Sequence, residues 1–369
     1  MICLYQINNY TQRVVMVLGK KMFYKACIIL CLFIQNNALC KTILVTGGAG
    51  FIGGSVTEAL LERGDTVIVL DCFVSLGHSR ALEYNQLKRD RLAVLKNQYQ
   101  ENLYIYECSI EDVQSCDEVF KTHAIDVVCH LAAHAGVRNA MESTKEFIQT
   151  NIQGTVNILD LAVKYGVSHC VLASSSSVYG DSADVPFTET QNTDYQSSLY
   201  GATKKSLELI AHVYHHLYGV STTCLRFFTV YGPYGRFDMA PFIFMDAIYN
   251  QKALTVYGDG TAIRDFTYID DIVDGIIKSI DKPLGYQVFN LGSTHTIVLK
   301  DFINVIAQTV GKQSIITYKD GIKADVRQTH ASVEKALLLL GYEPKALLKD
   351  GLQKMFDWYS KVITKECNE

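Results

Sequence analysis

The chain has 369 residues, which at roughly 150 residues per domain predicts two domains or one large elaborated domain. Hydrophobic residues make up 49% and charged residues 20%, with only 5 prolines, and this composition excludes a disordered or collagen-like chain. The net charge of -4 lacks the basic excess that binding to a phosphate backbone needs, so we expect no nucleic-acid partner. The 11 cysteines lack the paired spacing of a zinc site and predict free, mostly buried thiols.

Residues 1–40 precede the first folded pattern and differ from the rest of the chain. Residues 26–34 are all apolar, but a bilayer-spanning helix needs about 20 such residues. With the basic pair Lys20-Lys21 before it and Ala38-Leu39-Cys40 after it, the segment resembles a signal peptide or an uncleaved signal anchor. The alternative is an upstream start codon that adds a prefix to a cytosolic enzyme. We expect a cytoplasmic protein, with anchoring in a membrane through residues 22–40 as the alternative.

Residues 42–71 show the pattern of a β-strand, an α-helix and a second β-strand. A short apolar run at 42–45 is typical of a strand buried on both faces. Apolar residues then recur at helical spacing as far as residue 63, and Gly64 ends the helix. A second buried strand covers 66–70 and ends at Asp71.

The turn between the first strand and the helix predicts a dinucleotide site. Gly47 allows the tight turn, Gly50 lets the backbone approach a pyrophosphate, and Gly53 lets the helix pack closely on the sheet. Asp71 follows Gly53 by 18 residues, where its carboxylate can accept hydrogen bonds from both ribose hydroxyls. Because that carboxylate would repel a 2′-phosphate, the pattern favours NAD over NADP. A glycine-rich turn without a ligand is the alternative.

The alternation of strands and helices continues along the chain. Strands are expected at 126–132, 168–173 and 222–227, and helices at 150–165 and 199–218. This order predicts an α/β, Rossmann-type doubly wound parallel sheet, which binds ligands beyond the carboxyl ends of its strands. We expect an NAD-binding domain over 41–228. Residues 229–369 are expected to form mainly a smaller substrate-binding lobe of loops and short helices, with a strand at 287–291 that returns to the sheet.

Candidate catalytic side chains follow two of these strands. Tyr200 and Lys204 are four residues apart and project from one face of a helix. An ammonium group close to a phenol lowers the phenol's pKa, which makes it a usable general base. The spacing alone also suits an exposed helix pair. Residues 174–177 are four serines at the end of the preceding strand, and they bring hydroxyl groups to the same sheet edge.

From Lys41 to about residue 360, the sequence resembles the extended short-chain dehydrogenase/reductases of the nucleotide-sugar epimerase group. The matching motifs are Thr46 to Gly53, Leu131-Ala132-Ala133, Val178-Tyr179-Gly180, Tyr200 to Lys204, and Arg264 to Asp271. Within the group, Ala135-Gly136-Val137-Arg138 and residues 225–240 are most similar to UDP-glucuronate 4-epimerases. The resemblance implies C4 epimerisation of a UDP-uronic acid through a transient 4-keto sugar, with NAD recycled.

The resemblance also implies roles for particular residues. Tyr200 would take the proton of the 4-hydroxyl, Ser175 would relay or steady it, and Lys204 would bind the nicotinamide ribose. The cofactor would be held by Gly47, Gly50, Phe51, Ile52, Gly53, Asp71, Ser109, Ile110, Leu131, Ala132, Ala133, Tyr200 and Lys204. At Ser109 relatives place an aspartate that bonds the adenine amino group. That departure weakens the expectation for tight nucleotide binding.

Substrate-binding residues are implied in the same way. A 4-keto uronate loses CO2 readily, so the enzyme must hold the carboxylate, and Ser176, Ser177, Thr229 and Arg236 would do so. Arg138 would add positive charge, Arg264 would grip the diphosphate, and Asp325 would lie near the nucleotide. For Arg236 the alternative is a solvated loop arginine, and for Arg264 it is an ion pair with Asp270 or Asp271. Ser176 and Ser177 stand where related dehydratases and decarboxylases carry acids, which disfavours elimination.

Two other functions remain open on the sequence. One is a UDP-hexose 4-epimerase or another nucleotide-sugar epimerase or dehydratase of the same group, and the other is a non-catalytic NAD-binding protein. We expect no metal, because His212, His215 and His216 share a helix without a further ligand. Relatives are commonly homodimers, so we expect a four-helix interface made by residues 141–165 and 199–218.

Overall fold

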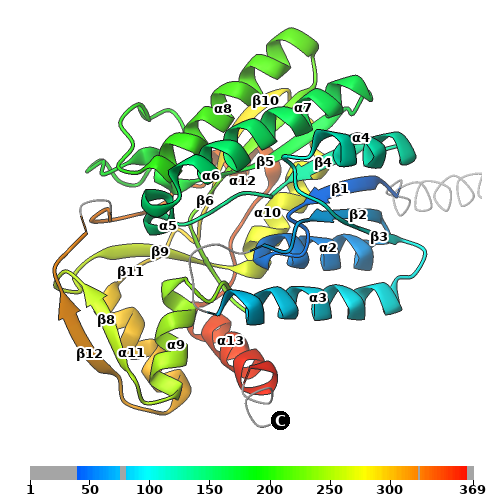
Figure 1. The fold of residues 1–369 in the computed structure, drawn as a ribbon. Helices are drawn as coiled ribbons and strands as arrows, with labels where there is room; N and C mark the ends of the chain where they lie inside the picture. Colours follow the sequence, from blue (N-terminus) through cyan, green and yellow to red (C-terminus); the bar gives the residue numbers. More distant parts are fainter. Residues whose placement is uncertain (1–39, 75–79, 323–324, 364–369) are drawn as a thin grey trace, which may run out of the picture. The chain divides into compact units, whose positions relative to one another are not determined.

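The computed structural model describes residues 40–74, 80–322 and 325–363 (Figure 1). The chain divides into two units at residues 41/42, and the sheets and helices described below belong to the second unit, residues 42–369. Residues 1–39, which carry most of the predicted signal or anchor segment, lie outside the described residues. Within the described ranges, no helix is both long enough and apolar enough to cross a membrane.

A seven-stranded parallel sheet forms the centre of the fold, as predicted. Its strands are β1 (Thr42–Thr46), β2 (Thr66–Asp71), β3 (Leu103–Glu107), β4 (Val127–His130), β5 (His169–Ser175), β6 (Ser221–Phe227) and β10 (Tyr286–Leu291). The spatial order is β10-β6-β5-β4-β1-β2-β3, so the winding reverses between β1 and β4. A crevice at such a reversal is where doubly wound folds bind ligands. β10 pairs with β6, and this is the returning strand expected at 287–291.

Helices cover both faces of this sheet (Figure 1). One face carries α2 (Phe51–Arg63), α3 (Ala81–Gln98) and α10 (Ile269–Asp281), and the other carries α4 (Val113–Thr122), α7 (Thr155–Lys164) and α8 (Leu199–Tyr218). On β1, Ile43 and Val45 belong to the core of the first face and Leu44 to the core of the second. Burial on both faces explains the continuous apolar run of this strand. As predicted, α2 ends at Gly64 and α8 at Gly219, each with a positive φ.

The α7 helix is preceded by three short helical segments, and a fourth follows β5. They are α5 (Val137–Glu142), α6 (Thr144–Ile148), the π-helical η1 (Gln149–Gly154) and the 3-10 helix η2 (Ser176–Tyr179). The helix expected at 150–165 is therefore the second part of a longer helical run that begins at Thr144.

Residues beyond 228 form more regular structure than the sequence indicates. Two small sheets contain β7 (Thr229–Tyr231), β9 (Ile263–Tyr268) and β11 (Thr296–Val298), and β8 (Ala253–Tyr257) with β12 (Ile315–Lys319). The helices are α9 (Ala240–Tyr249), α11 (Leu299–Val310), α12 (Glu334–Leu340) and α13 (Leu348–Val362). The expectation of only short helices was wrong, because α9, α11 and α13 contribute apolar side chains to one shared core and are stabilised there. The lobe boundary at 228/229 stays a prediction.

All seven cysteines among the described residues are free thiols. Cys116, Cys129, Cys170 and Cys224 are buried, as expected, whereas Cys40 and Cys72 are exposed. The four buried cysteines lie in strands β4, β5 and β6 and on the inner face of α4.

Candidate active site

The glycine turn after β1 has the geometry of a dinucleotide-binding loop. Gly47 has a φ of 68°, and its N–H donates to the carbonyl of Leu70 at 2.7 Å. A Cβ on Gly53 would lie 2.1 Å from the carbonyl oxygen of Gly47, so a side chain there is excluded. Gly50 is the N-cap of α2, and because it has no side chain, the first N–H groups of the helix are not capped by it and could donate to a ligand. These features fit a bound pyrophosphate.

Gly53→Ala is expected to destabilise the protein and to prevent cofactor retention. The added methyl group must push the turn away from α2, and such overpacking costs about 3 kcal/mol, or roughly 4 °C in Tm for a folded unit of this length. Gly321→Ala is the matched control, since its Cβ would meet nothing closer than 3.9 Å. Thermal melts and the NAD content of the purified variants measure both effects. Equal Tm and NAD content in the two variants would contradict this account of the turn.

Asp71 lies at the end of β2 and is anchored to the glycine turn. Its Oδ2 accepts from the backbone N–H of Ala49 at 3.1 Å, and its Oδ1 accepts from that of Phe73 at 2.7 Å. Lys88 of α3 lies 3.3 Å from Oδ1, and both side chains are buried. This ion pair was not predicted, because the sequence pattern did not indicate a helix at α3. Lys88 offsets part of the negative charge that was expected to exclude a 2′-phosphate.

The other predicted cofactor residues follow β3 and β4 at the same sheet edge. The N–H of Leu131 donates to the carbonyl of Thr46, and that of Ala132 donates to the Thr46 hydroxyl. Ser109 accepts from the N–H of Glu111, and Ile110 is buried against Gly154 of the π-helical segment. The carboxyl ends of β1, β2, β3 and β4 thus bring these predicted residues to one edge, as parallel strands require.

Ser175, Tyr200 and Lys204 meet where β5 ends and α8 begins. Ser198 caps α8, because its hydroxyl accepts from the N–H of Gly201 at 3.1 Å, and the cap fixes Tyr200 in the first turn. The Lys204 Nζ donates to the carbonyl of Ala173 at 2.7 Å and lies 5.9 Å from the centre of the Tyr200 ring. The hydroxyl of Ser175 is close enough to the Tyr200 phenol to lower the pKa of that phenol. The structure thus brings the three predicted catalytic residues together.

The electrostatics of this group differ from the sequence-based expectation. Burial raises the pKa of the Tyr200 phenol above its ordinary value, while the Ser175 hydroxyl and the charge of Arg236 lower it in part. Burial lowers the pKa of Lys204 to about 8. In the protein alone, the groups that oppose the rise in the Tyr200 pKa are therefore Ser175 and Arg236, whereas Lys204 had been expected to do so.

Arg236 lies in the loop before α9 and within electrostatic reach of Tyr200. Its Nε and Nη2 donate to the two carboxylate oxygens of Asp238, at 3.0 and 2.6 Å, and Nη2 also donates to the carbonyl of Ala135 at 2.8 Å. The alternative of a solvated loop arginine is wrong, because the side chain is only 25% exposed and is held by these contacts. The sequence did not indicate Asp238 as its partner.

Ser176, Ser177 and Thr229 lie at the same sheet edge. Ser176 and Ser177 begin the 3-10 helix, and Ser177 hydrogen-bonds to the Ser175 hydroxyl through its N–H and its hydroxyl, each at 3.1 Å. Phe227 pairs with Ser175 in the sheet, and Thr229 opens β7 two residues later. The three hydroxyl groups thus follow the adjacent strands β5 and β6.

Arg264 lies on β9, two residues from Phe266, which pairs with Thr229. It donates to the carbonyls of Ile263 and Arg327 through Nη1 and to that of Val326 through Nη2. The alternative partners are excluded among the described contacts, because Asp270 pairs with Lys354 and Asp271 accepts from backbone N–H groups. Burial lowers the pKa of Arg264, and Asp325 opposes this. Arg138 belongs to α5, and its side chain is outside the described part.

A buried network next to the predicted catalytic residues was not expected from the sequence. Glu208, on α8 one turn after Lys204, accepts from Arg226 Nε and Nη2, each at 2.8 Å, and from the hydroxyl of Ser174 at 2.6 Å. Arg226 Nη1 also donates to Tyr179. The network ties α8 to β5 and β6. A charged residue inside an apolar strand needs a buried partner, so Arg226 in the sequence of β6 could have indicated such a network.

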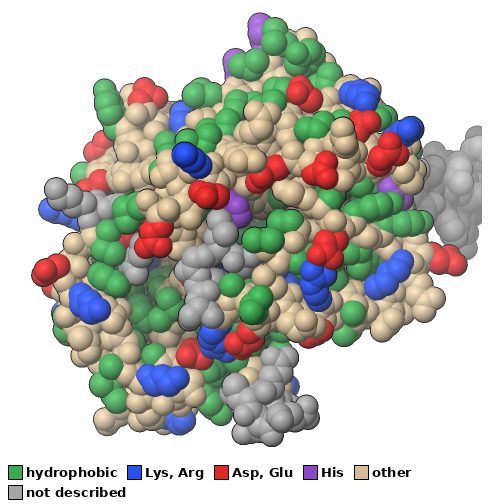
Figure 2. All heavy atoms as spheres, in the orientation of Figure 1, with side chains coloured by type: hydrophobic (Ala, Val, Ile, Leu, Met, Phe, Trp, Pro, Cys, Tyr) green, Lys and Arg blue, Asp and Glu red, His purple; other side chains and the backbone are tan. Residues whose placement is uncertain are grey.

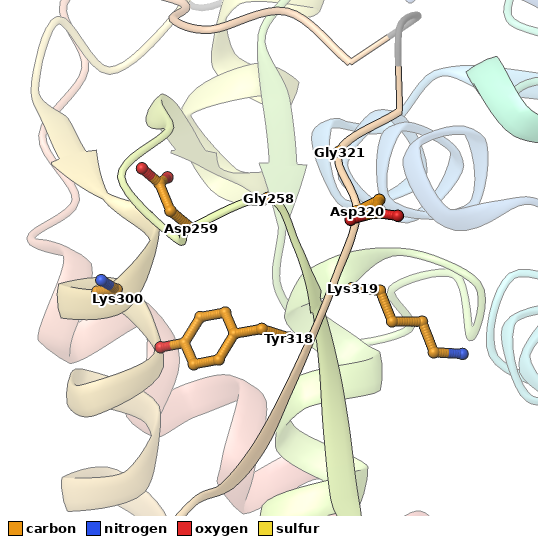
Figure 3. A pocket seen from close by; sticks show the side chains of 7 residues that line it. All are labelled: Gly258, Asp259, Lys300, Tyr318, Lys319, Asp320 and Gly321. Carbon is orange, nitrogen blue, oxygen red and sulfur yellow. The ribbon is translucent and has the colours of Figure 1, made fainter.

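A pocket of about 580 Å³ is lined by residues of the chain beyond 228 (Figure 3). It opens at the carboxyl ends of β8 and β12, where Tyr318 and Lys300 face each other with Nζ 5.7 Å from the ring centre. Its lining consists of Gly258, Asp259, Lys300, Tyr318, Lys319, Asp320 and Gly321, none of which was a predicted site residue.

The fold and the site together are those of a dehydrogenase-like enzyme with a Rossmann-type sheet, in which Tyr200 and Lys204 project from one helix. The chain belongs to the NAD dependent epimerase/dehydratase family, which matches residues 43–292 and confirms the resemblance. It is 42% identical over 324 residues to the UDP-glucuronate 4-epimerase of Thermodesulfobacterium geofontis, covering 87% of this chain and 96% of that protein.

Two solved structures are similar to this chain, and the extent of similarity is nearly the same for both. The UDP-glucuronic acid 4-epimerase from Bacillus cereus, in complex with UDP-glucuronic acid and NAD, superposes with a TM-score of 0.79 at 31% identity. The UDP-glucose 4-epimerase of Thermotoga maritima, with UDP-glucose, gives 0.78 at 31%. Each similarity covers 87% of this chain and 99% of the other. Backbone similarity therefore does not separate the two substrates, and the side chains must.

Proposed function

We propose that the protein is a UDP-glucuronate 4-epimerase that interconverts UDP-glucuronate and UDP-galacturonate. The observation that carries the proposal is Arg236, a guanidinium group held at the sheet edge within electrostatic reach of Tyr200. A substrate carboxylate could accept a hydrogen bond from this guanidinium in addition to Asp238, and the sugar of a UDP-hexose carries no carboxylate. The named UDP-glucuronate 4-epimerase that matches 87% of this chain supports the same substrate.

In the first step, a hydride must leave C4 of the sugar while a proton leaves the 4-hydroxyl group. Bound NAD supplies the hydride acceptor, and the glycine turn, Asp71 and the residues after β3 and β4 would hold it. Tyr200, as the phenolate, takes the proton of the 4-hydroxyl, and the Ser175 hydroxyl, which lowers the pKa of the phenol, steadies that proton. Lys204 donates to the carbonyl of Ala173 and would bind the nicotinamide ribose. The 4-keto sugar then rotates so that its other face receives the hydride, and Tyr200 returns the proton to the C4 oxygen.

The carboxylate of the substrate must be held while C4 is a ketone. A β-keto acid loses CO2 when its C5–C6 bond stands perpendicular to the carbonyl plane. Hydrogen bonds from Ser176, Ser177, Thr229 and Arg236 would keep the carboxylate near the ring plane. Arg264 and Asp325, next to each other in the second lobe, would bind the nucleotide part.

A UDP-hexose 4-epimerase is the second candidate, since the fold also superposes on a UDP-glucose 4-epimerase. Incubation with UDP-glucuronate and with UDP-glucose, followed by proton NMR of the anomeric region, separates the two. We expect faster conversion of UDP-glucuronate, by at least tenfold in kcat/KM. Faster conversion of UDP-glucose would establish the second candidate in its place.

A homodimer through α8 is proposed on the basis of an exposed apolar stripe. Leu209, Val213 and Leu217 recur every four residues on α8 and are 58%, 47% and 62% exposed, and Ile148 of α6 is also exposed. Hydrophobic side chains are visible over the end of α8 in Figure 2. An apolar stripe of this kind marks an interaction surface, and two copies would form the expected four-helix interface.

Val213→Glu is expected to convert the dimer into a monomer, because the new carboxylate would be buried against its symmetry mate. Sedimentation velocity measures the change in mass. Leu338→Glu is the control, since Leu338 is 82% exposed on α12, outside the stripe. A wild-type protein that sediments as a monomer would refute the dimer.

A cytoplasmic location is proposed from the thiol chemistry. The described cysteines are free, and oxidising compartments favour disulfides in cysteine-rich chains. Cell fractionation of the full chain, including residues 1–39, tests this location against the membrane-anchored alternative.

A further inference from the structure

The guanidinium of Arg236 is fixed by a bidentate ion pair. Nε donates to Oδ1 of Asp238 at 3.0 Å and Nη2 to Oδ2 at 2.6 Å, which is the fork geometry that leaves a guanidinium least freedom. The Asp238 side chain is 13% exposed, and the amide of Asn139 donates to its Oδ2 at 3.1 Å. Asn139 belongs to α5, so Asp238 is itself held from a second element.

The ion pair decides which edge of Arg236 is left for a ligand. The Nε–Nη2 edge is occupied by Asp238, and Nη2 also donates to the carbonyl of Ala135. No described group accepts from Nη1. A substrate carboxylate would therefore be bonded through Nη1, in a direction set by Asp238, and not through the edge that Asp238 already occupies.

We propose that Asp238 is a positioning residue, which aims Arg236 at the substrate carboxylate and so suppresses decarboxylation of the 4-keto uronate. This inference rests on the proposed function. The pair of Arg236 and Asp238 is formally neutral, so Asp238 reduces the attraction of the site for an anion while it fixes the direction of the hydrogen bond. Removing the negative charge of Asp238 should therefore disturb the orientation of the substrate carboxylate more than it weakens substrate binding.

The side reaction gives a readout that a structural role would not change. In the 4-keto uronate, the C5–C6 bond breaks, CO2 leaves, and the bonding electrons form an enolate with the C4 carbonyl. A proton from solvent then adds at C5, and return of the hydride to C4 with a proton to its oxygen yields UDP-pentose. A variant that is only less stable lowers the amount of active enzyme and leaves the ratio of pentose to galacturonate unchanged.

The test is Asp238→Asn in the full-length protein, assayed with UDP-glucuronate by NMR. We expect kcat for epimerisation to fall about tenfold with KM unchanged or lower, and the ratio of pentose to galacturonate to rise at least tenfold. Asn139→Ala, which keeps the carboxylate but removes its support, should raise the ratio by a smaller factor. Asp281→Asn, which breaks the pair of Asp281 with Arg63 at 2.7 Å, is the control and should leave the ratio unchanged.

Two results separate the possible failures. A wild-type protein that does not convert UDP-glucuronate overturns the proposed function itself. A wild-type protein that converts it, with a product ratio that Asp238→Asn does not alter, overturns the role of Asp238 and leaves the function standing. Asp238→Asn could also lose folded protein and activity in parallel while the product ratio stays constant. That result would likewise overturn the positioning role of Asp238.

Discussion

Tyr200→Phe is expected to lower kcat with UDP-glucuronate by about 10³-fold and to leave cofactor binding intact. The variant loses only the phenol oxygen, and positioned proton transfer contributes about 10² to 10⁴ in rate. The ring, which packs edge-on to Phe147 with centres 6.4 Å apart, remains in place. Stopped-flow or NMR turnover, together with the NAD content of the purified protein, measures both expectations.

The control for this variant lies on the same helix. Tyr214 donates its hydroxyl to Asp160 at 2.5 Å, away from the site, so Tyr214→Phe removes a comparable hydrogen bond from α8. It should keep turnover within about twofold. Unchanged turnover in Tyr200→Phe would mean that another group takes the proton, and the proposed mechanism would be wrong.

Arg236→Ala is expected to reduce turnover of UDP-glucuronate far more than turnover of UDP-glucose. A hydrogen bond to a charged group contributes about 1.5 to 3 kcal/mol, which corresponds to a loss of roughly 10- to 150-fold in kcat/KM. Arg236→Lys keeps the charge without the fork and should recover only part of this loss. Steady-state kinetics on both nucleotide sugars provide the comparison.

A matched arginine elsewhere controls for the loss of an ion pair. Arg63 pairs with Asp65 and Asp281 at the far end of α2, and Arg63→Ala should leave the ratio of the two substrates unchanged. Equal losses for UDP-glucuronate and UDP-glucose in Arg236→Ala would remove the support for a uronate substrate. The alternative of a neutral hexose would then be favoured.

The position of the site could be predicted from sequence because it depends on strand ends. Parallel strands end at or just before Gly47, Asp71, Ser109, Leu131 and Ser175, and the carboxyl ends of such strands share one edge. The four-residue spacing of Tyr200 and Lys204 likewise requires only that the segment be helical. Those relations are local, and a single sequence contains them.

The features that escaped prediction depend on contacts between distant elements. Helix α3 carries Lys88 and Arg91 on its buried face, so its sequence lacks a clear apolar stripe. The pairs of Asp71 with Lys88 and of Glu208 with Arg226 join separate elements, which spacing alone does not reveal. The pKa of Lys204 is likewise lowered by burial among residues from several elements.

Transfer of the hydride from and back to the same C4 atom is tested with UDP-glucuronate deuterated at C4. We expect UDP-galacturonate that retains the deuterium at C4, because the hydride taken from C4 is returned to the same sugar. Proton NMR and mass spectrometry of the product measure the label. Formation of UDP-galacturonate without the deuterium, of UDP-pentose as the main product, or of no product would contradict the account.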